Sequence, residues 1–334
     1  MNAEIAAFHA LLADSQRILL LSHVSPDGDA IGSQLGLQWL LQAIGHDVVA
    51  ANQDGVPYLL RSDQILPGWQ GVVQTPLQAR HAAGGYDLVI ALDSSDLPRL
   101  GKAYGPALAR APLVNIDHHI TNLHFGAVNL VDPAASSTAE MVWRLAEALG
   151  LPMSSQAAQC LLTGIVTDTR SFRVGNVTPA LLGVAQQLME AGAALTPISE
   201  LALERRNVDT ICLWGQALAA LRLEERIIWT AIPRAMRRGC NGVEQSDSGL
   251  ANFMVGAEEA DVALILTERE DGQVDVGLRA APGFDVAQVA LALGGGGHPR
   301  AAGCSLTLPL EQATAQVLDA LKRSLAQQRG ALTG

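Results

Sequence analysis

Short apolar runs alternate with helix-like segments through the first half of the chain, and this alternation constrains the fold most strongly. An apolar run of strand length, bounded by turn residues, is typical of a strand buried on both faces of a sheet. Strands that alternate with helices are typical of a parallel sheet covered by helices. The expected strands are Arg17–His23, Asp47–Asn52, Tyr86–Asp93 and Leu113–Asp117, and the expected helices are Met1–Ala13, Gly32–Ile44, Thr138–Leu149, Ser155–Val166 and Thr178–Ala191. The first half therefore predicts an α/β domain.

The second half predicts a separate, smaller α/β domain. At 334 residues the chain is long enough for two domains that each bury a core of their own. Residues Pro197–Leu221 have no loop-like composition, so we predict a helical connector at 196–221 between an N-terminal domain at 1–195 and a C-terminal domain at 222–330. In the C-terminal domain, strands are expected at Leu223–Ile232, Val262–Glu268 and Gln273–Arg279, and a helix is expected at Asp285–Leu293.

Composition excludes some classes of function. The formal net charge of -11 argues against a protein that grips long duplex nucleic acid, because such binding needs many Lys and Arg side chains on phosphates. Aromatic residues make up only 4% of the chain, which leaves few platforms for stacking a long single strand. No apolar run approaches the roughly 18 residues that cross a bilayer, and the N-terminus does not resemble a signal peptide. We expect a cytoplasmic protein with no membrane partner.

The cysteines predict neither a disulfide framework nor a thiolate zinc site. They are widely scattered and have no paired spacing. We expect all of them to be buried or inert: Cys160, Cys212, Cys240 and Cys304.

Metal-competent side chains follow several apolar runs of the first half. Strand-like runs end at His23, Asp93 and Asp117, and an apolar helix-like run ends at Asp168. Ligand sites in an open α/β sheet form outside the carboxyl ends of the strands, so these ends are expected to converge. Taken singly, an Asp after a strand is ordinary turn or cap chemistry, and the prediction depends on the whole set. Its members are His23, Asp27, Asp29, Asp93, Asp117, His118, His119 and Asp168.

The donor types in this set predict divalent metal. Carboxylate oxygens with neutral imidazoles suit manganese, magnesium or zinc, and the absence of thiolates argues against a soft metal. Manganese is our first expectation, with magnesium as the alternative. The number of carboxylates allows two metals roughly 3.5 to 4 Å apart that share a bridging carboxylate. Asp93 is the expected bridge because it stands alone at the end of a central strand.

Several strings of this sequence resemble the DHH phosphoesterase superfamily. SHVSPDGDAIG at 22–32, ALDSSD at 91–96, NIDHH at 115–119 and GIVTDTRSFR at 164–173 are similar to its four motifs. GLRA at 277–280 and GGGGHPRAAG at 294–303 are similar to its DHH-associated C-terminal domain. The resemblance covers about residues 15 to 308 and is closest to the nanoRNase and pAp-phosphatase branch. One departure is Arg170, where that branch more often has a small residue.

The resemblance implies a role for each residue of the set. It implies His23 and Asp27 on one metal, and Asp29, His118 and Asp168 on the other, with Asp93 between them. His119 would be a catalytic residue beside the scissile phosphate, and Asp117 would orient a neighbouring histidine. The active site is expected in the cleft between the two domains.

Substrate-binding residues are expected mainly in the C-terminal domain. Backbone N–H groups at Gly296 and Gly297 could approach a phosphate closely, with His298 and Arg279 as side-chain donors to the terminal phosphate or nucleotide. Arg99 could also reach a phosphate, although a surface arginine in a loop is nearly as good an interpretation. The run at 135–140 indicates a helix start first, and phosphate contact at that helix N-terminus second.

The predicted activity is hydrolysis of short oligoribonucleotides to mononucleotides and of pAp to AMP. A phosphodiesterase for cyclic or linear dinucleotides, such as c-di-AMP or pApA, is the nearest alternative. A pyrophosphatase or exopolyphosphatase fits less well, and a binding protein that senses a nucleotide without hydrolysis is the non-enzyme alternative. A homodimer is left open.

Overall fold

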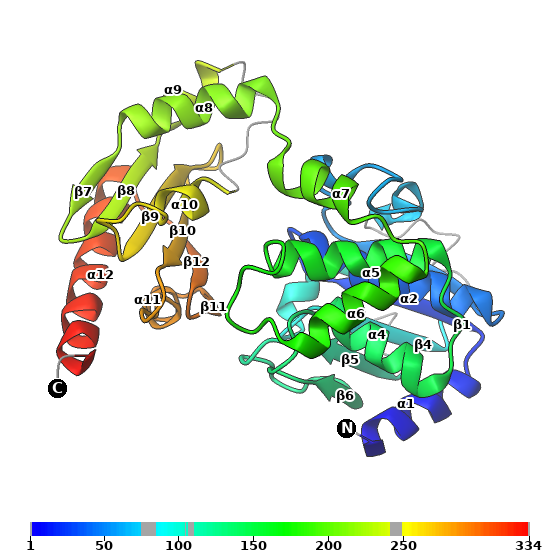
Figure 1. The fold of residues 1–334 in the computed structure, drawn as a ribbon. Coiled ribbons are helices and arrows are strands. Elements are labelled where there is room, and N and C mark those ends of the chain that lie inside the picture. Colours follow the sequence, from blue (N-terminus) through cyan, green and yellow to red (C-terminus); the bar gives the residue numbers. More distant parts are fainter. Residues whose placement is uncertain (1, 75–84, 104, 106–109, 241–248, 333–334) are drawn as a thin grey trace. The chain divides into compact units, whose positions relative to one another are not determined.

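The computed structural model describes residues 2–74, 85–103, 105, 110–240 and 249–332. The chain divides into two compact units, Met1–Arg205 (the first unit) and Arg206–Gly334 (the second unit), each shown in Figure 1. The division falls within 196–221, the segment predicted as a helical connector. That segment is not one continuous helix, because a π-helical turn ends at Glu204 and the next helix begins at Val208.

A six-stranded parallel sheet forms the centre of the first unit, as predicted. Its strands are β1 (Arg17–Ser22), β2 (Asp47–Asn52), β3 (Val73–Gln74), β4 (Leu88–Leu92), β5 (Leu113–Asp117) and β6 (Val128–Val131). The strand order is β3-β2-β1-β4-β5-β6. The order changes direction between β1 and β4, and such a switch point is where open parallel sheets place their ligands.

Helices cover one face of this sheet with a large apolar core, in which Ile18 and Ile90 pack against the helices. The helical elements are α1 (Asn2–Ala13), η1 (Tyr58–Leu60), η2 (Trp69–Gly71), η3 (Pro98–Ala103), α2 (Gly28–Ala43), α4 (Thr138–Leu149), α5 (Ser155–Asp168), α6 (Pro179–Glu190), α7 (Leu195–Ile198) and the π-helical η4 (Ser199–Glu204). The other face carries a smaller cluster in which Leu19 and Val89 pack with Leu100 of η3. Met1 of the predicted first helix lies outside the described residues.

Helices α2 and α5 approach each other through glycine. A Cβ added at Gly32 of α2 would lie 2.6 Å from the carbonyl oxygen of Cys160 and 2.8 Å from the amide nitrogen of Gly164, both in α5. No side chain fits that gap, because real Cβ atoms do not approach backbone so closely. The contact fixes the first turn of α2 beside the last turn of α5, where the predicted ligands Asp29 and Asp168 lie.

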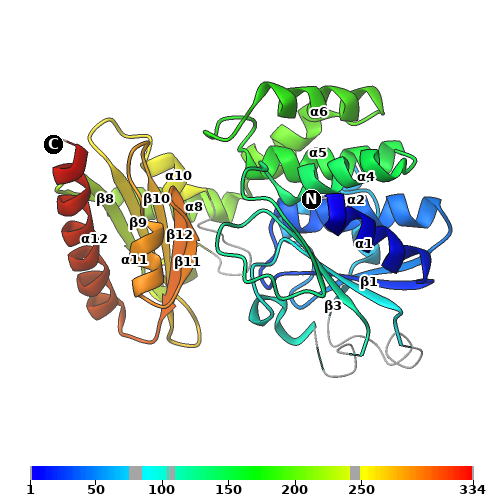
Figure 2. The ribbon, with the colours of Figure 1, turned by 90° about the horizontal axis from the view of Figure 1, so that it is seen from below.

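A six-stranded mixed sheet forms the second unit, with the order β11-β12-β10-β9-β8-β7. Its strands are β7 (Arg222–Glu224), β8 (Ile227–Ile232), β9 (Val262–Glu268), β10 (Val274–Ala280), β11 (Gly296–His298) and β12 (Ala301–Leu306), and its helices are α8 (Val208–Ala219), α9 (Arg234–Arg238), α10 (Leu250–Met254), α11 (Ala287–Ala292) and α12 (Leu310–Leu332). Helices α11 and α12 pack on one face of the sheet, and α8 and α10 pack on the other (Figure 2). Within this second sheet, the described strands β8 and β9 pair in parallel and the other pairs are antiparallel.

Some predicted elements of the second unit are wrong. The single strand expected at Leu223–Ile232 is a hairpin, in which β7 and β8 are joined through Glu225 and Arg226 at φ values of 49° and 65°. Two left-handed residues make the tight turn that suits a two-residue hairpin. Such turns usually carry Asn or Gly, so Glu225 and Arg226 do not indicate a turn by their residue types. Strands β3, β6, β11 and β12 and helices α9, α10 and α12 were not predicted.

The prediction that no disulfide forms is also wrong. Cys212 of α8 is bonded to Cys240, which follows α9, across a sequence separation of 28 residues. The fold brings α8 beside α9, and no short spacing motif announces such a pair. The other two cysteines, Cys160 and Cys304, are free and buried, as expected. Among the described residues, no helix combines the length and the apolarity needed to cross a membrane.

Candidate active site

His23 follows β1 directly and turns one ring nitrogen toward a group of carboxylates. Its Nδ1 lies 2.8 Å from the carbonyl oxygen of Val24, which fixes the proton on Nδ1 and leaves Nε2 unprotonated in the neutral ring. That Nε2 lies 3.4 Å from an oxygen of Asp93 and 4.0 Å from an oxygen of Asp27. Burial opposes the charged ring, yet the hydrogen bond to Asp93 and the charges of both carboxylates raise the pKa of His23. The free nitrogen therefore faces negative charge.

Asp27 and Asp29 both cap helices while facing this site. One oxygen of Asp27 accepts the amide N–H groups of Asp29 and Ala30, each at 3.0 Å, and so begins α2. The two oxygens of Asp29 accept the N–H groups of Thr138 and Ala139, at 2.7 and 2.9 Å. These two N–H groups lie at the N-terminus of α4, where phosphate contact was the second expectation. They donate instead to a carboxylate of the chain itself. The predicted helix start is confirmed, with Ser137 as its cap.

Asp93 follows β4 and lies at the centre of the cluster. Its backbone has a φ of 56°, in the left-handed region that non-glycine residues adopt rarely and mostly at functional sites. Its side chain is only 2% exposed, and one oxygen accepts the hydroxyl of Thr138 at 3.1 Å. Burial alone would raise the pKa of this carboxyl, but His23, His119 and His118 outweigh it and hold the pKa well below the usual range. Asp93 is therefore an anion.

His118 at the end of β5 faces three carboxylates. Its Nδ1 lies 3.4 Å from the carbonyl oxygen of Ala135, while Nε2 lies 3.6 Å from Asp93, 3.6 Å from Asp168 and 3.9 Å from Asp29. Burial and neighbouring carboxylates raise the pKa of Asp29 well above its usual value. Burial also raises the pKa of Asp168 to about 7, although His118 opposes the shift. Burial is the largest cause of both shifts, and the charges of nearby carboxylates add to it.

Two groups that consist only of predicted metal ligands could each hold a metal ion. The ligand atoms of His23, Asp27 and Asp93 lie within 4.8 Å of one another, and so do those of Asp29, His118 and Asp168. Both groups contain only carboxylates and imidazoles, the donors that suit manganese, magnesium or zinc. Burial raises the pKa values of Asp29 and Asp168, and a bound cation would favour their charged forms. The residues present therefore fit a pair of divalent cations.

His119 lies beside these groups and is held by Asp117. Its Nδ1 lies 2.7 Å from Asp117, which is fully buried, and 3.6 Å from Asp93. Burial lowers the pKa of His119, but the hydrogen bond to Asp117 and the charge of Asp93 outweigh it and raise the pKa to about 9. Exposed Arg99 lies close enough for its positive charge to lower the pKa values of His23 and His119.

The other predicted residues lie in the second unit. Arg279 of β10 pairs with Ala301 of β12, which in turn pairs with His298 of β11. Residues directly opposite each other point to the same face of a sheet, so Arg279 and His298 share a face with roughly 10 Å between their Cα atoms. Arg279 donates from Nε to the Oδ1 of Asn252 at 2.9 Å, and from Nη1 to the carbonyl of Leu278 at 2.8 Å. The guanidinium is thus oriented by neutral groups.

The glycine run forms an edge strand and not a flexible turn. Gly296 and Gly297 belong to β11, which pairs only with β12 among the described strands. Gly297 has a φ of 137°, and a Cβ there would lie 2.5 Å from the carbonyl oxygen of Ala301. Close backbone packing therefore explains Gly297, and the strand presents its backbone at the edge of the sheet.

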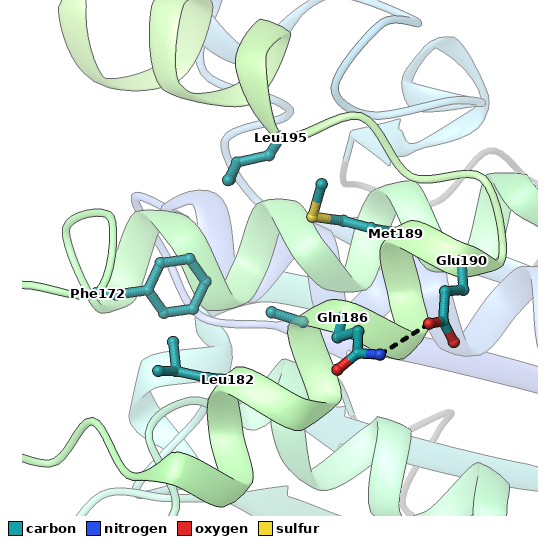
Figure 3. A pocket seen from close by; sticks show the side chains of 7 residues that line it. Phe172, Leu182, Gln186, Met189, Glu190 and Leu195 are labelled. Carbon is teal, nitrogen blue, oxygen red and sulfur yellow. Dashed lines mark hydrogen bonds between the residues drawn. The ribbon is translucent and has the colours of Figure 1, made fainter.

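A pocket of about 540 Å³ lies elsewhere in the first unit (Figure 3). It is lined by Phe172, Leu182, Ala185, Gln186, Met189, Glu190 and Leu195. Its polar members Gln186 and Glu190 are hydrogen-bonded to each other at 2.8 Å. None of the predicted site residues lines it, so this pocket contributes no chemistry to the metal-competent groups.

Thr138 was missed as a site residue by sequence reasoning. It was assigned to a helix start, whereas its hydroxyl reaches Asp93 and its amide reaches Asp29. Both partners are far away in the sequence, at separations of 45 and 109 residues. The only available signal was the hydroxyl-rich run before a helix, which is common in proteins without any site.

Comparisons with known proteins agree with this geometry. Residues 17–165 match the model of the DHH family, N-terminal domain, and residues 240–327 match the DHHA1 domain. The chain is 34% identical over 315 residues to a Thermus thermophilus protein named bifunctional oligoribonuclease and PAP phosphatase NrnA, covering 93% of this chain and 90% of that protein. It is 26% identical to the cyclic-di-AMP phosphodiesterase GdpP of Geobacillus thermodenitrificans, covering 87% of this chain and 45% of that protein.

A solved structure shows the same fold. The exopolyphosphatase-related protein of Bacteroides fragilis superposes with a TM-score of 0.88 at 22% identity, covering 100% of this chain and 98% of that one. The family matches cover the first sheet and strands β9 to β12 of the second, and they include every one of the metal-competent residues except Asp168, which lies just beyond the matched 17–165. The chain therefore belongs to the DHH family of phosphoesterases and carries a DHHA1 domain after its DHH domain.

Proposed function

We propose that the protein hydrolyses short oligoribonucleotides to mononucleotides and pAp to AMP. The observation that carries this proposal is the pair of adjoining carboxylate and imidazole groups at the carboxyl ends of β1, β4 and β5. The similarity over nearly the whole length to a protein named as an oligoribonuclease and PAP phosphatase supports the choice of substrate. Short RNA and pAp are thus the proposed partners, while a homodimer and a cytoplasmic location remain predictions.

We assign one metal to His23 and Asp27 and the other to Asp29, His118 and Asp168, with Asp93 shared between them. Asp93 suits the bridging role because its two oxygens face different histidines, at 3.4 Å from His23 and 3.6 Å from His118. Manganese is the proposed metal, with magnesium as the alternative. When bound, two such cations supply Lewis acidity at the phosphate and lower the pKa of an attacking water.

The chain's own residues orient the substrate and manage its charge. His119 carries a proton at neutral pH in the metal-free site, so it can donate to a phosphate oxygen or to the departing oxygen. Asp117 holds the ring of His119 from the buried side. Arg99, exposed near the same histidines, is the proposed donor to a phosphate oxygen in the first unit. These groups stabilise negative charge as it develops.

The second unit is proposed to bind the end of the substrate away from the scissile bond. The planar fork of Arg279 suits two phosphate oxygens, and it is already oriented by Asn252. His298, on the same sheet face, supplies a second donor, and the edge strand at Gly296 and Gly297 lets a phosphate approach the backbone. Such a set selects a terminal phosphate or nucleotide over a long strand.

Hydrolysis of cyclic or linear dinucleotides is the second candidate, because of the similarity to the protein named as a cyclic-di-AMP phosphodiesterase. The chain spans less than half of that protein, whereas it spans 90% of the NrnA relative. The length match favours short RNA and pAp.

A direct test compares substrates and one variant. Manganese-supported hydrolysis of a 5′-labelled diribonucleotide is measured beside pAp and c-di-AMP, with the wild type and Asp93→Ala. Asp87→Asn is the matched control, because Asp87 precedes the same strand at its opposite end and accepts the backbone N–H groups of 16 and 17. Cleavage of the diribonucleotide and pAp, lost only in Asp93→Ala, supports the proposal. Cleavage of c-di-AMP alone moves the protein to the second candidate, and activity in Asp93→Ala overturns the metal assignment.

A further inference from the structure

Asn122 connects the loop after β5 to the carboxylate that holds His119. Its Nδ2 lies 2.6 Å from Asp117, 2.7 Å from the Oδ1 of Asn115 and 3.2 Å from the carbonyl of Ser94, and its two hydrogens are shared among these acceptors. None of these partners is exposed: Asp117, Asn115 and Ser94 are each at 0%. A single amide group thus joins two strand ends and one loop inside the protein.

The orientation of this amide is fixed. Its Oδ1 accepts the backbone N–H of His124 at 2.7 Å, and a backbone N–H can only donate. The amide nitrogen must therefore face the three acceptors. The loop itself is held by two backbone bonds, from the N–H of Asn122 to the carbonyl of His119 at 3.1 Å and from that of Leu123 to Ser95 at 2.8 Å.

Asn115 and Asp117 meet Asn122 because of the strand between them. Residues two apart on a strand point to the same face, so both side chains leave β5 on one side. The Nδ2 of Asn115 donates to the carbonyl of Ser94 at 3.1 Å, which leaves its Oδ1 for Asn122. The clamp therefore consists of Asn115, Asn122 and the carbonyl of Ser94, and it holds one oxygen of Asp117 through Asn122.

We propose that Asn122 is a positioning residue that acts on His119 through Asp117. Asp117 uses one oxygen for His119 at 2.7 Å and the other for Asn122 at 2.6 Å, so the two bonds together fix the rotation of the carboxylate. Without Asn122, the carboxylate can turn, and the ring of His119 loses its fixed direction. Partners that orient a catalytic or metal-binding imidazole from behind typically change activity by about 10- to 100-fold. The effect on turnover rests on the proposed function, whereas the effect on the ring does not.

The first experiment observes the ring directly. Histidine-selective ¹⁵N NMR of the full chain with magnesium bound compares the wild type, Asn122→Ala and the control Asn129→Ala. Asn129 of β6 is opposite Asn115 in the sheet and makes two hydrogen bonds to Gly126, so its loss removes a comparable amide that does not touch Asp117. The Nδ1 resonance of His119 is assigned from the signal that His119→Ala lacks. We expect the chemical shift of this resonance to change in Asn122→Ala and to remain unchanged in Asn129→Ala.

The second experiment measures whether Asn122 acts through His119. Hydrolysis of the diribonucleotide is measured for Asn122→Ala, His119→Ala and the double variant, with equal metal affinity and equal thermal stability as conditions for comparison. We expect Asn122→Ala to lower kcat by about 10- to 100-fold in the wild type and to cost nothing further once His119 is removed. An equal loss in both backgrounds, or an unmoved His119 resonance, overturns the proposal.

The two readouts separate the possible failures. A wild-type protein that does not cleave the diribonucleotide contradicts the proposed function, but the NMR comparison still decides whether Asn122 orients the ring. A normal wild-type activity with an unmoved resonance contradicts the positioning role alone.

Discussion

The two units prepare their binding residues in opposite ways. In the first unit, several carboxylates and imidazoles are buried together, and burial with nearby carboxylates raises the pKa values of Asp29 and Asp168. In the second unit, Arg279 is only partly buried and donates to the neutral oxygens of Asn252 and Leu278. The buried carboxylates thus need a bound cation for charge balance, whereas the partly exposed guanidinium keeps its charge through contact with water.

The units also differ in what holds them together. The second unit has a covalent link between α8 and the residue after α9. In the first unit, α2 and α5 touch through backbone at Gly32 and Gly164. Metal removal is therefore expected to weaken the first unit, and reduction of the disulfide is expected to weaken the second.

Asp168→Asn breaks the charge pattern of the first unit and has the largest expected effect. Loss of one ligand from an electrostatic site lowers kcat/KM by about 10³-fold or more. The same change removes a carboxyl that is partly uncompensated, so the metal-free variant should melt at a higher temperature than the wild type at pH 8. Activity assays with manganese and thermal unfolding in chelator check the two effects. Near wild-type activity, or a lower melting temperature, would contradict the charge argument.

Reduction of the Cys212–Cys240 bond addresses the second unit. A loop closed over 28 residues stabilises the folded state by about 3 to 4 kcal/mol in the chain-entropy description. Hydrogen exchange with and without a dithiol should show faster exchange in β8 and β9, with β1 and β4 unchanged. The double variant with Cys212→Ser and Cys240→Ser should match the reduced protein. Equal effects in both sheets would show that the units do not unfold separately.

Metal removal should affect the first unit in a pH-dependent way. The pKa values of Asp168 and His119 are raised, to about 7 and about 9, so each stabilises the metal-free fold fully below its unfolded pKa and loses that contribution as the pH rises through the folded value. The chelated protein should therefore lose stability from pH 6 to pH 9. Metal binding displaces the proton of Asp168, so at a fixed magnesium concentration the apparent Kd falls as the pH rises and the difference in stability between bound and free protein should widen. Melting curves at several pH values, with magnesium or with chelator, measure this difference in stability. A difference that narrows as the pH rises would contradict the assignment of the metal ligands.

Arg279→Ala tests whether the second unit acts on binding alone. A lost hydrogen bond to a charged phosphate costs about 1.5 to 3 kcal/mol, which raises KM by about 10- to 100-fold while kcat changes little. Arg279→Lys should recover part of this loss, because an ammonium keeps the charge without the planar fork. Steady-state kinetics and metal titration check it. A fall in kcat at unchanged KM, or a loss of metal affinity, would place Arg279 with the reaction and not with the substrate end.

Arg170→Gly is the smallest expected effect. Arg170, Ser171 and Phe172 are three consecutive left-handed residues after the helix that carries Asp168, with φ values of 51°, 61° and 61°. Relief of one such conformation should stabilise the first unit by about 1 kcal/mol. Denaturant unfolding of the metal-bound protein measures it, and Ser171→Gly serves as comparison. A less stable Arg170→Gly protein would mean that contacts of the arginine side chain outweigh the backbone strain.

The sequence predicted the parts of the molecule that depend on local patterns. Strands such as β1 and β4 are continuous apolar runs, and their carboxyl ends carry His23 and Asp93, so fold and site could be inferred together. The β7–β8 turn could not, because Glu225 and Arg226 adopt left-handed conformations that their residue types do not favour.

The missed features depend on tertiary contacts. The disulfide needs α8 to lie beside α9, and the contact of Thr138 with Asp93 joins residues 45 apart. The clamp at Asn122 was hidden for the same reason, since only the loop geometry shows that its amide faces Asp117. Periodicity reports which side of an element is buried, but it does not report which polar groups meet.

The glycine contact between α2 and α5 has a consequence for how this site can change over evolution. The separation of Asp29 from Asp168 is set by two helix backbones that touch, so it does not depend on the size of any core side chain. Substitutions elsewhere in the core can accumulate while the distance between these two carboxylates stays constant. A single added methyl group at Gly32 would move them apart. The distance between Asp29 and Asp168 is thus determined by the absence of a side chain at these glycines. In distant relatives, we expect the glycines to be retained more often than the core side chains.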